Sequence, residues 1–429
     1  MSERPISLRA YARLLRTNRN VRLLWIGQMV SQIGDWLYVV AIFDVLLAST
    51  GSARTVAFAF VLMVLPQVFA APAAGVLNDR LSRRKMMLIS DWARAAIVFA
   101  MIFAQTADRL WLLYLLLILE TIFWALYEPA RNAVIPNITC SKEEALVANG
   151  LSGLTWSVTL MLGSAIGGVL AATLGHNFVF VANSLTFVVS AFCAWGMRFH
   201  EPHLEHVEPM KLRDLADFRP LLEGASYVLR DRWLGATMLV KAGLGVLGTN
   251  WVVLPIMGER IFPMQLSLLS PRAGGMLAMS LLMGCRGIGA FLGPLASSRI
   301  VPNHDAGYRT AILASFGMAA AGYLALGQAS ELWIAGLAVA LAHSGASIAW
   351  VYSSTLLQTH TDDRFRGRVF SAEFAMSMLT LSVVSYSAGV LVDEGVSIRM
   401  VATLTGAIVI VPAILWSLAL QRWHPARSV

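Results

Sequence analysis

The chain has 429 residues, of which 57% are hydrophobic and only 14% are charged. Soluble globular chains are nearer about 45–50% apolar and about 25% charged, so this composition excludes an ordinary soluble protein and indicates a polytopic membrane protein. The formal net charge is +8, but the cations lie in short segments beside apolar runs, which favours topology signals over nucleic-acid binding. The apolar runs lack the alternation of barrel strands, so we predict an all-α membrane protein.

Apolar runs of about 20 residues predict twelve transmembrane helices. In the first half they cover residues 21–48, 55–77, 86–105, 110–130, 145–174 and 178–197, and in the second half residues 234–261, 274–298, 308–327, 332–357, 369–392 and 398–420. This pattern predicts two six-helix halves, residues 21–198 and 233–421, which are pseudo-symmetric. They are flanked by a segment at 1–20 and a tail at 422–429, and joined by a connector at 199–232 with an amphipathic helix over 212–229.

The distribution of basic residues between the predicted loops gives an orientation. If the N-terminus is cytoplasmic, almost all loop arginines and lysines fall on the same side as the N-terminus. The opposite side keeps only Arg54, Arg109, Arg260, Arg272 and Arg399. Because short cytoplasmic loops carry an excess of basic residues, we expect a multi-pass protein of the cell membrane with both termini in the cytoplasm. Residues 1–22 lack the apolar core of a cleavable signal peptide, so the first spanning helix is expected to act as the signal.

Polar residues follow one face of the first predicted helix. Gln28, Ser31, Gln32 and Asp35 have helical spacing, and Asp35 lies roughly 20 Å from the cytoplasmic end at 1.5 Å per residue. A polar stripe at that depth faces away from lipid. It either forms helix–helix hydrogen bonds or lines a cavity with a titratable carboxylate, and we favour the cavity.

The fourth and fifth helices carry similar stripes. Glu120, Trp124 and Glu128 share a face of the fourth helix, which makes Glu120 the second candidate carboxylate for substrate or proton binding. On the fifth helix a stripe of small residues, which includes Gly163 and Gly167, predicts close helix packing.

The second half carries intramembrane cations instead. Lys241 and Arg286 lie in the seventh and eighth spans, and Lys241 is close enough to the cytoplasmic end to extend its amine toward the interface. The deeper Arg286 requires a buried partner, which the sequence does not identify. Three further cavity candidates are Asn250, His343 and Trp350, although a lone buried histidine is more often a packing residue.

No catalytic or metal-binding pattern accompanies these residues. The three cysteines are scattered, and the chain has no CxxC, GxSxG or P-loop motif. We therefore expect a protein that is not an enzyme and that needs no metal and no cofactor.

The loop between the second and third predicted helices reads GVLNDRLSRRKM. Gly75, Asp79, Arg80, Arg83 and Arg84 resemble the loop motif G-x-L-a-D-R-x-G-R-R/K of the major facilitator superfamily, with Ser82 in place of the second glycine. The segments NRNVRLLWIGQMVSQIGD, ISDWARA, EPARNAVIP and LLQTHTDDRFRGRVF resemble its macrolide-efflux and siderophore-exporter branch, which belongs to the drug:proton antiporters. The resemblance covers essentially the whole chain.

The resemblance implies a cytoplasmic gate. Asp79 would face the start of the eleventh helix, and Arg83 would bridge Asp79 to Glu128; we also assign Asp91 and Arg94 to this gate. The antiporter motif G-P-x-x-G-G of the fifth helix corresponds to Gly163, Ser164, Gly167 and Gly168, with the proline replaced.

Together these features predict a secondary active transporter that works by alternating access. It would export amphipathic small molecules of the drug, macrolide or siderophore type, with protons as the coupling ion, as a monomer in the lipid bilayer without nucleic-acid partners. A lysophospholipid or lipid flippase of the same fold is the alternative, and a non-transporting membrane scaffold is a third.

Overall fold

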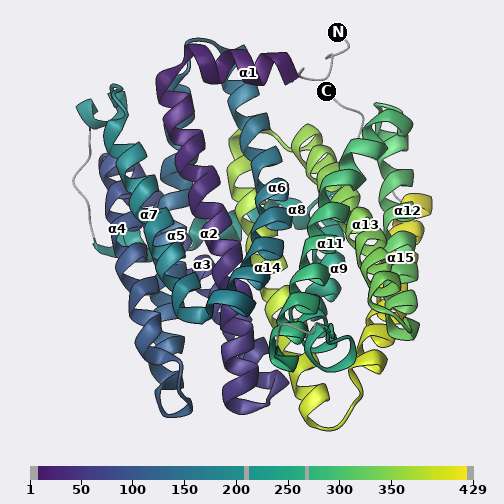
Figure 1. The fold of residues 1–429 in the computed structure, drawn as a ribbon. Helices are drawn as coiled ribbons and strands as arrows, with labels where there is room; N and C mark the ends of the chain where they lie inside the picture. Colours follow the sequence, from purple (N-terminus) through teal and green to yellow (C-terminus); the bar gives the residue numbers. More distant parts are fainter. Residues whose placement is uncertain (1–7, 207–211, 266–269, 423–429) are drawn as a thin grey trace. The chain divides into compact units, whose positions relative to one another are not determined.

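All regular structure in the described residues is helical. The computed structural model describes residues 8–206, 212–265 and 270–422 (Figure 1). Twelve segments within these residues are long and apolar enough to cross a bilayer: Arg19–Thr50, Ala53–Arg80, Arg83–Ala104, Ala107–Ile138, Lys142–Leu174, His176–Gly196, Arg232–Ile261, Pro271–Ile300, Asp305–Gln328, Leu332–His360, Asp363–Asp393 and Ile398–Arg422. The predicted fold class and number of spans are confirmed.

Most spans are single helices, with bounds within a few residues of those predicted, except that the fourth extends to Ile138 instead of 130 and the eleventh begins at Asp363 instead of 369. They are α2 (Arg19–Thr50), α3 (Ala53–Arg80), α4 (Arg83–Ala100), α5 (Leu110–Ile138), α6 (Lys142–Leu174), α7 (His176–Gly196), α11 (Pro271–Ile300), α12 (Asp305–Gln328), α13 (Leu332–His360), α14 (Asp363–Asp393) and α15 (Ile398–Arg422). The seventh span is broken into α9 (Arg232–Leu244), the 3₁₀ turn η5 (Gly245–Thr249), α10 (Asn250–Ile256) and the π-helical turn η6 (Met257–Ile261).

Contacts divide the chain into two compact units that differ from the predicted halves. Unit 1 comprises residues Met1–Val45 and Phe69–Asp217, and unit 2 comprises Leu46–Val68 and Phe218–Val429. The outer part of α3 therefore belongs with the second unit, whereas the predicted boundaries assign it to the first half. The unit boundary within α3 falls between Pro66 and Pro72, neither of which has a backbone N–H for the helix.

Unit 1 is built around α4, which packs against α5 and α7. A short amphipathic helix, α1 (Leu8–Thr17), lies across the end of α2 (Figure 1). It is held there by Leu14 in a core with Val21 and Leu24. Helix α6 approaches α2 through glycines: a Cβ added at Gly163 would lie 2.6 Å from Trp36 Cβ, and one at Gly167 would lie 2.8 Å from Leu37 Cα.

Unit 2 is a second helical bundle, in which α13 packs against both α11 and α12, and α15 packs against α12. Glycines again allow the helices to approach, because a Cβ at Gly289 would lie 2.2 Å from the Ala340 carbonyl oxygen. The predicted connector helix is α8 (Arg219–Leu229), which begins later than expected because residues Leu212–Ala216 form a 3₁₀ turn. It packs on α14, where Arg368 Nη1 lies 2.9 Å from Glu223 Oε2.

The N-terminal part of α3 is tied to the end of α14 within unit 2. Asp393 accepts hydrogen bonds from the Ser52 hydroxyl and from the backbone N–H groups of Ala53 and Arg54. The two backbone N–H groups belong to the first turn of α3 and have no acceptor within that helix, so Asp393 acts as a cap supplied by another helix.

Candidate functional site

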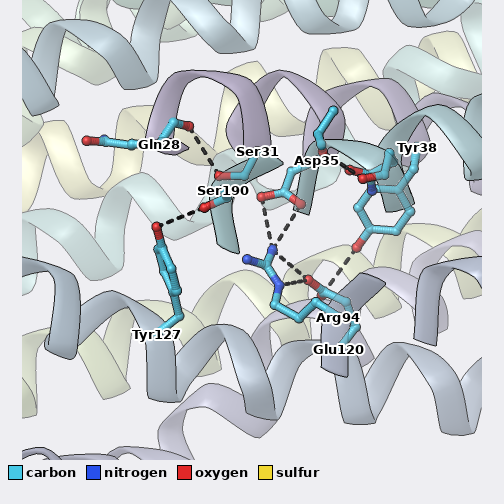
Figure 2. A network of polar contacts seen from close by, with 10 residues as sticks. Gln28, Ser31, Asp35, Tyr38, Arg94, Glu120, Tyr127 and Ser190 are labelled. Carbon is cyan, nitrogen blue, oxygen red and sulfur yellow. Dashed lines mark hydrogen bonds and ion pairs between the residues drawn. The ribbon is translucent and has the colours of Figure 1, made fainter. Parts of the chain in front are cut away.

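The most extensive polar network in unit 1 is centred on Arg94 of α4. Its Nη2 lies 3.0 Å from both carboxylate oxygens of Asp35 on α2, and its Nε lies 2.8 Å from Glu120 Oε1 on α5 (Figure 2). The guanidinium also lies 4.0 Å from the centroid of the Phe187 ring on α7. Because Arg94 is only 1% exposed, these groups fix it in the interior of the helical bundle.

Two further residues complete the network. The Tyr38 hydroxyl, one turn after Asp35 on α2, donates a hydrogen bond of 3.3 Å to Glu120 Oε2 (Figure 2). Asp91 lies one turn before Arg94 on α4, is 0% exposed and interacts with the side chain of Ser190 on α7. Among the described residues, Arg94 is the charged group of opposite sign that interacts with Asp91.

The network contains more acids than bases. Asp35, Asp91 and Glu120 supply three carboxyl groups, and Arg94 supplies one positive charge. An uncompensated buried ion costs several kcal/mol, roughly. The cluster is therefore neutral only when protons are bound to it, which is the property required of an intramembrane proton site.

This arrangement changes the role predicted for two residues. Asp91 and Arg94 were assigned to the cytoplasmic gate, but they lie with the intramembrane carboxylates and not with the loop motif. Asp35 and Glu120 were predicted as site residues, and one guanidinium bridges them. Tyr38 was missed, although it continues the polar face of α2 one turn beyond Asp35.

A second cluster of polar residues lies nearer to the start of α2 and the end of α5. Arg131 of α5 donates two hydrogen bonds to the carboxylate of Glu128, one of them from Nε at 3.1 Å. It also donates to Gln28 Oε1 at 2.9 Å. Gln28 Oε1 also accepts from Ser152 of α6, and Thr159 donates to Gln32. The polar stripe of α2 thus makes the helix–helix hydrogen bonds that were its alternative interpretation. Trp124 is half-buried on α5.

The contacts of the loop motif differ from those implied by the resemblance. Glu128 pairs with Arg131, and the Arg83 guanidinium donates to the Ala133 carbonyl at 2.9 Å. The expected Arg83–Glu128 bridge is therefore corrected.

The connector holds this loop within unit 1. Glu201 accepts from the Ser82 hydroxyl at 2.6 Å and from the Arg83 backbone N–H at 2.7 Å. Arg80 pairs with Asp214 at 3.0 Å, and Arg84 donates to the Ala194 carbonyl. Asp79 and Gly75 are exposed. The loop is thus fastened to residues that follow α7.

A buried carboxylate that the sequence analysis did not single out lies further along α2. Asp44 Oδ2 is 2.8 Å from His176 Nε2 at the start of α7. The sequence does contain an indication of Asp44, because a carboxylate within a transmembrane span is unusual whatever its partner.

The site candidates of unit 2 lie at two places. Lys241 of α9 pairs with Glu373 of α14 at 2.7 Å, and its Nζ lies 4.3 Å from the Trp350 ring centroid. Arg286 lies elsewhere, 4.2 Å from the Trp251 ring centroid. Asn250 is buried and donates to the Leu247 carbonyl.

The profile of the Major Facilitator Superfamily matches residues 24–302. The match covers more than half of the chain, and together with the twelve spans it shows that this chain belongs to the Major Facilitator Superfamily. It is therefore a multi-pass membrane protein of a family of transporters and not of enzymes.

Two curated relatives are exporters by name. Macrolide efflux protein A of Streptococcus pyogenes is 27% identical over 221 residues, which are 51% of this chain and 53% of that protein. The putative bacilysin exporter BacE of Bacillus amyloliquefaciens is 24% identical over 394 residues, which are 91% of this chain and 93% of that protein. The first match thus spans only about half of the relative's length.

Solved structures support the fold. The crystal structure of the nucleoside transporter NupG matches with a TM-score of 0.69 and 10% identity, over 94% of this chain and 100% of that chain. At this identity the likeness shows the transporter fold alone.

Proposed function

We propose that this protein exports amphipathic small molecules by alternating access in exchange for protons. The observation that supports the proposal best is the network of Asp35, Asp91 and Glu120 around one guanidinium, that of Arg94. Proton binding to this network would change the charge around Arg94, and release of the proton would restore it. The names of the two exporter relatives favour export over import.

Coupling follows from competition for the same carboxyl groups. A cationic or donor-bearing substrate near Asp35 or Glu120 stabilises the ionised form, and a bound proton stabilises the neutral form. By linkage, each ligand lowers the affinity for the other by the same factor. Two ligands that exclude one another at one site, each bound on a different side of the membrane, produce antiport.

The proposal includes an orientation. The excess of basic residues in the loops on the side of the N-terminus favours a cytoplasmic location of both termini in the cell membrane. In this orientation the motif loop, held by Glu201 and Asp214, lies on the cytoplasmic side.

The experiment uses purified protein in proteoliposomes with an imposed pH gradient and a pH-sensitive dye inside. Erythromycin, ethidium and a lysophosphatidylcholine serve as test substrates for the drug and lipid classes. We expect erythromycin, ethidium or both to move in the direction opposite to the protons, with a matching change of the internal pH. Asp35→Asn should abolish the pH change or reduce it by about tenfold or more.

A matched control lies on the same helix. Asp44→Asn removes another buried carboxylate of α2, one that pairs with His176 outside the network, and it should leave coupling intact. Coupled transport that survives Asp35→Asn would remove the role given to Asp35. Movement of lysophosphatidylcholine alone would replace the exporter by a lipid flippase, and no flux of any substrate would favour a scaffold.

A further inference from the structure

Arg286 is a deep intramembrane cation without an acidic partner among the described residues. It lies near the middle of α11, and its Nη1 is buried with no hydrogen-bond partner. The three buried lysine and arginine side chains in the described spans each have a carboxylate: Arg94 has Asp35 and Glu120, Arg131 has Glu128, and Lys241 has Glu373. Arg286 is the exception, and it lies entirely within unit 2.

One aromatic ring holds the guanidinium in place. Arg286 Cζ lies 4.2 Å from the centroid of Trp251 on α10, and Trp251 stacks on Phe60 at 4.5 Å with an interplanar angle of 19°. A cation–π contact contributes about 0.5–2 kcal/mol. The desolvation penalty for a buried ion is several kcal/mol, roughly, so the ring positions Arg286 without compensating its charge.

The polar groups around Arg286 can donate hydrogen bonds. Tyr323 of α12 and His343 of α13 both interact electrostatically with it, and no carboxylate does so among the described residues. The Tyr323 and His343 rings meet edge to face, with centroids 6.2 Å apart. His343 is 6% exposed, and its Nε2 has no hydrogen-bond partner in the described chain.

We propose that Arg286, Tyr323 and His343 bind the oxyanion of an amphipathic substrate, such as a carboxylate, a sulfonate or a phosphate monoester. Arginine suits this role because its planar donors match two oxygens of such a group. Lys241 does not compete for the anion, because Glu373 already neutralises it. The proposal rests on the proposed transport function and adds to its substrates amphipathic molecules that carry an anionic group.

The test measures binding to detergent-solubilised protein at neutral pH without any gradient. Three probes are paired with neutral counterparts: dansylglycine with dansylglycinamide, naphthalenesulfonate with naphthalenesulfonamide, and lysophosphatidic acid with monoacylglycerol. Wild-type protein should bind at least one anion more tightly than its neutral counterpart, by about tenfold or more. Which pair shows the preference distinguishes an organic acid from a lipid headgroup.

Substitutions assign the preference to the residue. Arg286→Gln should remove it, and Arg286→Lys should keep part of it. Arg309→Gln is the matched control, because Arg309 also lies over a tryptophan ring, 4.3 Å from that of Trp233, but has Asp305 as its acidic partner. That variant should bind like wild type, and thermal unfolding of Arg286→Gln near the wild-type temperature shows that its own fold is intact.

The results decide the proposal independently of proton coupling. Three results would overturn the anion site. They are equal binding of the anion and the neutral probe in all three pairs, failure of all probes to bind, and a preference that Arg286→Gln retains. If the preference depends on Arg286 and no substrate moves in exchange for protons in the proteoliposomes, the anion site stands and the proton antiport fails.

Discussion

At the scale of single residues, Arg94 is the group on which the three carboxyl groups of its network depend. It contacts Asp35 and Glu120 directly, and within the described part of the chain it is the positive charge that interacts with Asp91. Removal of one member of a buried ion pair is costly because the partner stays behind as an uncompensated charge. The arginine therefore stabilises the fold as well as taking part in the proposed proton site.

We expect Arg94→Met to destabilise the protein by about 3–5 kcal/mol near neutral pH. The carboxyl groups left without Arg94 bind protons more readily in acid, so the loss of stability relative to wild type should decrease as the pH falls. Thermal unfolding of both proteins at about pH 8 and about pH 5.5 measures the difference. A deficit of the same size at both values would show that loss of packing against Phe187, rather than loss of charge, causes it.

The sequence identified the carboxylates but not the residue that joins them. Asp35 and Glu120 are visible because a charge in an apolar run is unusual, and helical spacing groups residues on one helix. Arg94 lies on a third helix, and nothing in the spacing along one helix reveals a partner on another. The same reason explains why the sequence identifies no partner for Arg286, whereas the incorrect Arg83–Glu128 bridge was implied by the family resemblance.

At the scale of helices, the approach of α6 to α2 depends on the absence of two side chains. Gly163 and Gly167 lie one turn apart, and a Cβ at either would overlap Trp36 or the backbone of Leu37. The small-residue stripe predicted close packing. The sequence alone does not identify the helix that packs against this stripe, because a helix face lined by glycines allows any neighbouring helix to approach closely.

We expect Gly167→Ala to lower stability by about 1–3 kcal/mol, because the added methyl group forces α6 away from α2. Gly153→Ala is the control on the same helix, where a Cβ would meet nothing within 4 Å. It should be neutral or stabilise the helix by up to about 1 kcal/mol, since alanine has the higher helix propensity. Thermal unfolding measures both variants, and equal effects would contradict the packing role.

The seventh span shows where prediction of a helix from its length and composition reaches its limit. The apolar run is long enough for one helix, and this was predicted. The structure divides it at η5, where a Cβ at Gly245 would lie 2.7 Å from Thr380 and one at Gly248 would lie 2.8 Å from the Leu381 carbonyl oxygen. These glycines let α14 approach, and Trp251 and Asn250 follow directly after the break.

At the scale of the whole molecule, the predicted topology can be read from a native cysteine. Cys140 is exposed at the end of α5, while Cys193 and Cys285 are partly buried within spans. With both termini in the cytoplasm, Cys140 lies on the cytoplasmic side. A membrane-impermeant maleimide should therefore label wild-type protein in inverted vesicles and leave it unlabelled in right-side-out vesicles.

A control for the other side is Ser397→Cys in a variant that also carries Cys140→Ser. Ser397 lies in the short link before α15, beside the end of α14 and so at the opposite end of these helices from the Asp363 link. Its labelling should show the reverse pattern. Labelling of Cys140 from outside would invert the orientation and with it the side assigned to the motif loop.

The division of α3 between the two units has a consequence for the order in which the protein is made. Synthesis runs from the N-terminus, so all of unit 1 has been synthesised once Asp217 has left the ribosome. Residues Leu46–Val68, by contrast, are made before any of the other residues of unit 2, which begin again at Phe218. The cap that Asp393 supplies to the start of α3 is synthesised near the end of the chain. During biogenesis, this part of α3 enters the membrane without its final neighbours and must wait for the last third of the protein to provide them.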